Sequence, residues 1–143
     1  MNSKTYEPPD SKLGELEPPY QTDAEARIGR MLDRYDTPFF YHQPRLIYDQ
    51  GYHDIWHPTF TLPTYDSLVV EYADPNSGVD HAERHRVYRF NGIAALVARD
   101  QDLSTTRWDE TLMRRVHTEY QRAQAEYRHQ QIHGYRRPDI ERP

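Results

Sequence analysis

Glu71 is the side chain whose position most favours chemistry, because it interrupts an otherwise apolar run, Ser67–Ala73 (SLVVEYA). Burying an unpaired carboxylate is costly. Glu71 therefore either faces a polar site, where its oxygens could bind a divalent cation, or pairs with an arginine. The apolar residues on both sides of it predict a strand buried on both faces, as in the centre of a sheet between helices.

Histidines offer a second kind of chemistry. His81 and His85 are four residues apart in an expected helix, and an imidazole pair at that spacing can bind zinc or another transition metal. His53, Asp54 and His57 precede the strand expected at 59–62, earlier in the chain. The pattern places no third ligand beside the pair, so histidines that are solvated or hydrogen-bonded at the surface are the favoured interpretation.

The same helix carries three arginines and a tyrosine, Arg84, Arg86, Arg89 and Tyr88. Arginine forks grip phosphate and tyrosine can stack on a base, so these residues could line a nucleic-acid-binding surface. The alternative is an ordinary solvated helix face on which the arginines lie beside acids. The sequence favours this second interpretation.

The elements that must position these residues follow from periodicity and from turn residues. Apolar spacings of three and four predict a helix at 22–35, and Thr22-x-x-Glu25 is typical of a capping box, which explains Glu25 without chemistry. Further along, the pattern predicts strands at 39–42 and 45–49 (a hairpin or a bent pair), a polar aromatic loop at 51–57, strands at 59–62 and 67–73, a helix from Asp80 to about Phe90, a strand at 93–98 and a long helix at 107–131. This order predicts an α/β fold with a mixed central sheet covered on both faces.

The order and several motifs resemble the PD-(D/E)XK restriction-endonuclease-like superfamily, in its small very-short-patch-repair-like branch. The motifs are the helix from Ala24 to Tyr35 followed by Thr37-Pro38-Phe39-Phe40-Tyr41, then His57-Pro58-Thr59-Phe60-Thr61-Leu62-Pro63, Leu68-Val69-Val70-Glu71-Tyr72-Ala73, Arg86 to Ile93, and Asp102-Leu103. The resemblance covers roughly residues 22–116. It implies an αβββαβ core, here extended by the long C-terminal helix.

The resemblance also assigns roles within the site. In the superfamily an aspartate and a second acid hold one or two divalent metals, and a lysine two residues after the second acid helps to activate water. Glu71 matches the second acid, and Glu25 matches a helix glutamate that approaches the metal. Thr59 stands at the aspartate position and Ala73 at the lysine position, while the only lysines of the chain are Lys4 and Lys12. The catalytic set is therefore degenerate, and we expect no cofactor, with Mg²⁺ or Mn²⁺ bound only if the site is active.

Length and composition are those of one domain of 143 residues, divided into an extended tail at 1–20, a nuclease-like domain at 21–131 and a polar tail at 132–143. A surface arm packed through Tyr6 and Tyr20 is the alternative for the first tail. There is no cysteine and no apolar run that could span a membrane, so we expect a soluble cytoplasmic protein without membrane partners. The net charge of −5 disfavours tight non-specific DNA binding but allows a local basic groove.

Three functions remain open from the sequence. The first is a nuclease-fold protein that no longer cleaves and binds DNA or a partner protein. The second is an active metal-dependent DNA endonuclease with a rearranged site around Glu71 and Glu25, helped by Asp54, Asp66 or His57. The third is an assembly component that associates through the 107–131 helix. That helix carries an apolar seam at Met113, Val116, Tyr120, Ala123 and Tyr127, whose other explanation is packing on the protein's own sheet.

Overall fold

The computed structural model describes residues 16–133, so the tails expected at 1–20 and 132–143 lie largely outside the described residues. Within the described part, Tyr20 packs against the core and meets the Tyr41 ring at 5.1 Å, which favours the surface arm over an unpacked tail, and residues 132 and 133 belong to the last helix. The elements are α1 (Asp23–Arg34), β1 (Phe40–Tyr41), β2 (Arg45–Asp49), β3 (Tyr52–Trp56), β4 (Phe60–Leu62), β5 (Leu68–Tyr72), α2 (His81–Phe90), β6 (Ala95–Ala98) and α3 (Trp108–His133), with short 3-10 turns η2 (Pro63–Tyr65) and η3 (Asp100–Leu103). The expected α/β fold with a mixed sheet and a long C-terminal helix is confirmed.

Four strands form the central sheet in the order β1-β4-β5-β6. β1 and β5 each run antiparallel to β4, whereas β6 runs parallel to β5. The crossover from β5 to β6 passes through α2, as a parallel connection requires. β5 is central and every one of its five residues is buried, so the prediction from the apolar run around Glu71 is confirmed.

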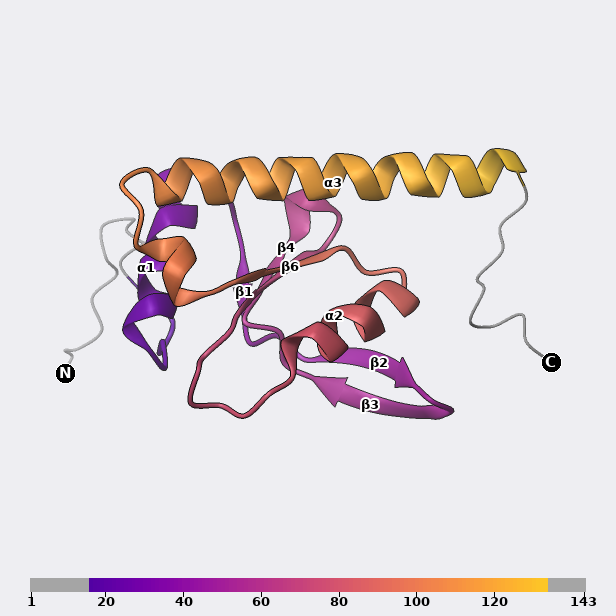
Figure 1. Cartoon of the computed structure of the whole chain (residues 1–143), viewed down its shortest axis with the longest axis horizontal. Helices are drawn as coiled ribbons and strands as arrows, with labels where there is room; N and C mark the ends of the chain where they lie inside the picture. Colours follow the sequence, from indigo (N-terminus) through magenta and orange to yellow (C-terminus); the bar gives the residue numbers. More distant parts are fainter. Residues whose placement is uncertain (1–15, 134–143) are drawn as a thin grey trace, which may run out of the picture.

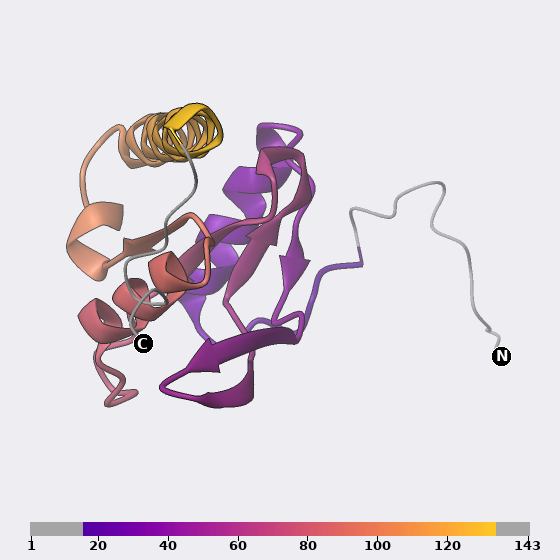
Figure 2. The same cartoon turned by 90° about the vertical axis from the view of Figure 1, so that its right-hand side faces the viewer.

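Alternation along β5 divides the core into two clusters. Leu68, Val70 and Tyr72 pack with the buried residues of α1 and α3, whereas Val69 packs with α2, β2 and the partly buried Trp56 of β3. Figure 1 shows α3 above the sheet strands, with α2 and the β2–β3 hairpin below them, and Figure 2 shows the same layers after a quarter turn. Glu71 lies one residue from Val70 and Tyr72, so its side chain belongs to the α2 side of the sheet.

Residues 45–56 form a hairpin of their own, which corrects the loop expected at 51–57 and excludes a hairpin between 39–42 and 45–49, one of the two alternatives for those strands. β1 pairs with β4 instead of β2, and the loop expected at 51–57 contains strand β3, which pairs with β2 along its whole length. The two residues between the strands, Gln50 and Gly51, have φ of 52° and 89°. Positive φ at both positions is what a two-residue type I′ turn requires, and its twist matches that of the flanking strands.

α3 is buried over its first half only. Leu112, Met113 and Val116 are buried against the sheet, and the ring of Tyr120 lies edge-on to Tyr65 of η2 at 5.5 Å. Beyond this point the helix extends past the sheet, and Tyr127 is exposed (Figure 1). The first half of the expected seam therefore packs on the protein's own core. Within residues 16–133 no helix combines the length and apolar character needed to cross a bilayer.

Candidate functional site

Glu71 projects from β5 into the space beneath α2, where its side chain is 6% exposed. One oxygen, Oε2, accepts a hydrogen bond from Arg84 at 3.0 Å and another, a short one, from the Tyr88 hydroxyl. The other oxygen, Oε1, lies 3.3 Å from the Thr59 hydroxyl, which donates to it. Of the two alternatives left by the sequence, Glu71 thus has the arginine partner.

Arg84 is fixed from several sides. Asp80 caps the start of α2 by accepting from the backbone N–H of Glu83 at 3.1 Å, and this sets the helix one turn before Arg84. The guanidinium carbon lies 4.1 Å from the centre of the Trp56 ring, within cation–π range, and the same guanidinium donates to the Tyr88 hydroxyl at 3.1 Å. The charge of Arg84 therefore sits between a carboxylate and an aromatic face, with little room to reorient.

Burial, reinforced by the neighbouring Glu71 charge, raises the pKa of Tyr88 above its ordinary value. The phenol therefore keeps its proton at neutral pH and serves as a donor to Glu71. Its ring is 1% exposed and meets Trp56 edge-on at 5.2 Å, so it offers no face on which a base could stack. The prediction that Tyr88 binds nucleic acid disagrees with this burial.

Thr59 and Ala73 occupy the positions that the resemblance reserves for an aspartate and a lysine. The Thr59 hydroxyl accepts from the backbone N–H of Tyr72 at 3.1 Å while it donates to Glu71, so it joins the start of β4 to the end of β5. Ala73 is buried directly after β5. Both residues have structural partners here, and neither supplies a charge.

A divalent metal does not fit these residues. The lone carboxylate of Glu71 already accepts hydrogen bonds from three side chains and is neutralised by Arg84. Among residues 16–133 no three histidine, aspartate or glutamate side chains are grouped so as to hold a metal ion. A hard dication needs several oxygen ligands, whereas Oε2 of Glu71 already accepts from Arg84 and from Tyr88.

Glu25 lies apart from this cluster. It is on α1, which packs against the opposite face of the sheet, and no hydrogen bond joins it to Glu71. Its Oε1 accepts from the Tyr41 hydroxyl at 2.5 Å and from the backbone N–H of Gln21 at 3.2 Å, while Thr22 caps the backbone N–H of Glu25. The capping interpretation agrees with these contacts, and the two glutamates are not brought together.

The remaining arginines of α2 are paired with acids at the surface. Arg86 donates twice to Glu83, and Arg89 lies 3.8 Å from Glu126 of α3. With the Arg84–Glu71 pair, each of the three arginines expected to bind phosphate therefore lies beside an acid, although Glu126 is shared with Arg122 and compensates the charge of Arg89 only in part. The interpretation of α2 as a helix face with internal ion pairs is the one that the geometry favours.

The two histidines of α2 have separate environments. The ring nitrogen Nε2 of His85 donates to the Ala95 carbonyl of β6 at 2.9 Å. His81 is buried, its Nδ1 has no hydrogen-bond partner within the described part of the chain, and burial lowers its pKa. The acids Glu71 and Asp80 act against this shift, and Arg84 and Arg99 add to it.

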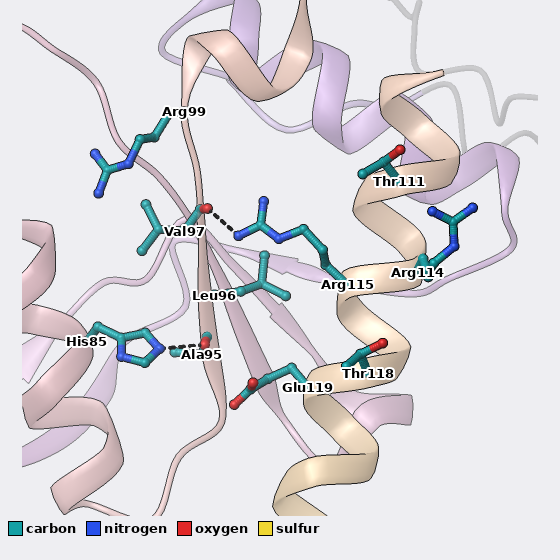
Figure 3. Close-up of a pocket in the computed structure, with 10 residues that line it drawn as sticks. All are labelled: His85, Ala95, Leu96, Val97, Arg99, Thr111, Arg114, Arg115, Thr118 and Glu119. Carbon is teal, nitrogen blue, oxygen red and sulfur yellow. Dashed lines mark hydrogen bonds between the residues drawn. The ribbon is translucent and has the colours of Figure 1, made fainter. Parts of the chain in front are cut away.

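A groove along β6, which sequence reasoning missed, lies between α2 and α3. It has a volume of about 550 Å³, and its floor is the backbone of Ala95 to Val97. Figure 3 shows His85 reaching this strand from α2 and Arg115 from α3, where Arg115 donates to the Val97 carbonyl at 2.8 Å. Arg99 stands at one end, and Arg114 lies on the outer rim. The adjacent pair Arg114-Arg115 was the signal that the sequence offered for it.

Comparison of this chain with protein-family models, with curated proteins and with solved structures finds no match.

Proposed function

We propose that this chain is a PD-(D/E)XK-like protein that does not cleave phosphodiesters and instead serves as a binding module for DNA or for a partner protein. The observation that carries the proposal is the neutralisation of Glu71 by Arg84. A nuclease of this kind uses the second acid to hold a metal, whereas here that acid holds a guanidinium at 3.0 Å.

The arrangement of elements supports the fold half of the proposal. α1 is followed by three sheet strands joined by antiparallel pairing (β1 with β4, and β4 with β5), then by α2 and by β6, which runs parallel to β5. This is the αβββαβ order that the resemblance implies, with the β2–β3 hairpin inserted after the first sheet strand. Glu71 lies in the third of these sheet strands, where the superfamily places its second acid.

The chemistry of the site supports the loss of cleavage. Metal-assisted hydrolysis needs a dication that lowers the pKa of a bound water and neutralises charge on the attacked phosphate. Threonine at 59 and alanine at 73 contribute neither the second carboxylate nor the amine. No described residue is a lysine, so no neighbouring element supplies that amine to the site.

A cleavage assay tests the proposal directly. Purified full-length protein is incubated with supercoiled plasmid and with single-stranded DNA in Mg²⁺ and in Mn²⁺, beside Glu71→Gln and Glu71→Ala. We expect no nicking by any of the three proteins. Nicking by the wild type that disappears in both variants, while circular dichroism shows that Glu71→Gln is folded, would overturn the proposal and favour an active endonuclease.

Metal binding provides a second test, because a carboxylate placed at position 59 should allow the site to bind a divalent cation. We expect no heat of Mn²⁺ binding for the wild type in calorimetry, and binding after Thr59→Asp combined with Arg84→Ala. Thr59→Asp alone should bind less well, since Arg84 still occupies Glu71. Binding of Mn²⁺ by the wild type that Glu71→Gln abolishes would show that the resident guanidinium does not exclude the ion.

An assembly role is the second candidate and rests on the distal half of α3. Tyr127 is 60% exposed and Ile132 is 75% exposed, on a helix that extends beyond the sheet. Sedimentation of the full chain over a concentration series, compared with Tyr127→Ala, tests it. A dimer that Tyr127→Ala dissociates supports this role, and a monomer at every concentration excludes self-association.

A further inference from the structure

Positive charge without an acidic partner gathers at the β6 groove. Arg99 and Arg114 both line it, and neither forms an ion pair with any acid among residues 16–133. Arg115 lies 3.6 Å from Asp102, so part of its charge is compensated there. Glu119, the acid of the groove wall, is held by Arg122 through contacts as short as 2.6 Å. The groove is therefore cationic in a chain whose net charge is −5.

The exposed side of α3 extends this charge along the helix. Thr111, Arg114, Thr118, Gln121 and Arg128 follow each other at spacings of three, four, three and seven residues, all are exposed, and we call this row the α3 stripe. The spacing puts them on one side of the helix, and no acid stands among them. Hydroxyl, amide and guanidinium groups are the side-chain donors that proteins use to contact phosphate oxygens and sugars.

The floor of the groove disfavours an added peptide strand. Ala95 and Val97 are edge-strand residues, and their outward carbonyls already accept hydrogen bonds from His85 and Arg115. A peptide that extends the sheet would need these carbonyls as its partners. The available donors are instead the side chains of the rim, which suit a ligand rich in acceptors.

We propose that the β6 groove and the α3 stripe bind the phosphodiester backbone of a nucleic acid strand without reading its bases. Arg99 and Arg114 contact phosphates, and Thr111 and Thr118, one on each side of Arg114 along α3, donate hydrogen bonds to the neighbouring backbone. This inference rests on the proposed binding function and moves the interface from the arginines of α2, which are paired with acids, to the opposite wall of the groove.

The test compares two double variants that remove the same charge. Fluorescence anisotropy measures binding of labelled single-stranded DNA, duplex DNA and single-stranded RNA, each of 20 nucleotides, by the wild type, by Arg99→Ala/Arg114→Ala and by the control Arg86→Ala/Arg89→Ala. We expect the first variant to lose at least tenfold in affinity, while the control stays within about twofold. The slope of log affinity against log salt should fall by about 1 to 2 in the first variant, as expected for losing two phosphate contacts.

The possible failures are distinguishable. If the wild type binds and the control variant loses affinity instead, the groove is the wrong interface while the binding function stands. If no nucleic acid binds at 50 mM salt, the nucleic-acid branch of the function fails together with the groove. If poly-glutamate displaces the oligonucleotide at equal charge concentration, the groove belongs to acidic polypeptides and the inference is wrong. Thermal melts of both double variants verify that each is folded.

Discussion

Two regions of this molecule use arginine in opposite ways. Beneath α2, the side chain of Arg84 is 22% exposed, and its guanidinium lies between Glu71 and the ring of Trp56. At the β6 groove, Arg99 and Arg114 face solvent without an acidic partner in the described part of the chain. The comparison teaches that the partner of an arginine, and not its position on a helix, decides whether it can hold an external anion.

The cause of the difference is burial. Glu71 belongs to a central strand, where its carboxylate loses its hydration. Only a nearby opposite charge can offset the free-energy cost of that lost hydration. Arg84 supplies that opposite charge, and its guanidinium is therefore not free to bind a phosphate. The outer side of α3 imposes no such requirement, so Arg114 keeps its charge for solvent or for a ligand.

The largest effect is expected on stability, when the buried pair of Glu71 and Arg84 is broken. Glu71→Ala leaves the mostly buried Arg84 uncompensated and should lower the free energy of unfolding by about 3 kcal/mol. Urea denaturation followed by circular dichroism measures it. In an Arg84→Met background, Glu71→Ala should lower the free energy of unfolding much less, because no buried guanidinium then remains without its partner.

The exposed pair of Glu83 and Arg86 is the matched control for this cycle. Glu83→Ala should leave the unfolding midpoint unchanged within error, since ion pairs in solvent contribute little. Equal losses for Glu71→Ala and Glu83→Ala would contradict the view that Glu71 and Arg84 form a buried pair on which the layer between β5 and α2 depends.

A smaller effect is expected at the groove, where neighbouring arginines differ in role. Arg115→Ala removes the donor to the Val97 carbonyl and should cost about 1 kcal/mol. Arg114→Ala should leave stability unchanged, because Arg114 has no ion-pair partner within residues 16–133. Thermal melts of the two variants measure this difference, and a reversed order would show that Arg114, and not Arg115, ties α3 to the sheet.

The smallest effect concerns pH. Burial lowers the pKa of His81 below 6.5, so the folded chain takes up a proton there less readily than the unfolded chain. Stability from this group is complete above pH 6.5 and declines as pH falls through the folded-state pKa, with a slope of at most about 1.4 kcal/mol per pH unit. Denaturation at pH 7.5, 6.5 and 5.5 should show a shallower decline for His81→Gln, and parallel curves would refute the assignment.

Much of the fold could be predicted because local signals coincide with long-range ones. Thr22 and Asp80 mark the starts of α1 and α2, where each accepts the hydrogen bond expected of a cap. The hairpin was missed because His53 and Asp54 give β3 a polar, loop-like composition, and because the Gln50-Gly51 turn lacks the asparagine or aspartate that usually marks a type I′ turn.

The candidate site was predictable only in part. An unpaired carboxylate in an apolar strand indicates that a partner exists, but its identity depends on how α2 packs on β5, which places Arg84 beside Glu71 across 13 positions of sequence. The match of Glu25 to a metal-approaching glutamate was misleading. Thr22 caps the backbone N–H of Glu25, and its carboxylate accepts from the Tyr41 hydroxyl. The groove has contributions from three separate elements, so no spacing within one element could reveal it.

The one-sided burial of α3 has a consequence for hydrogen exchange. The helix has 26 residues and is about 39 Å long, yet its buried contacts to the sheet end near Val116 and its ring contacts near Tyr120. Amide protons around Leu112 should exchange with deuterium only when the whole domain opens, whereas those beyond Glu126 should exchange by fraying of the free end. A single helix will then report both global unfolding and local melting, as a graded protection profile along its length.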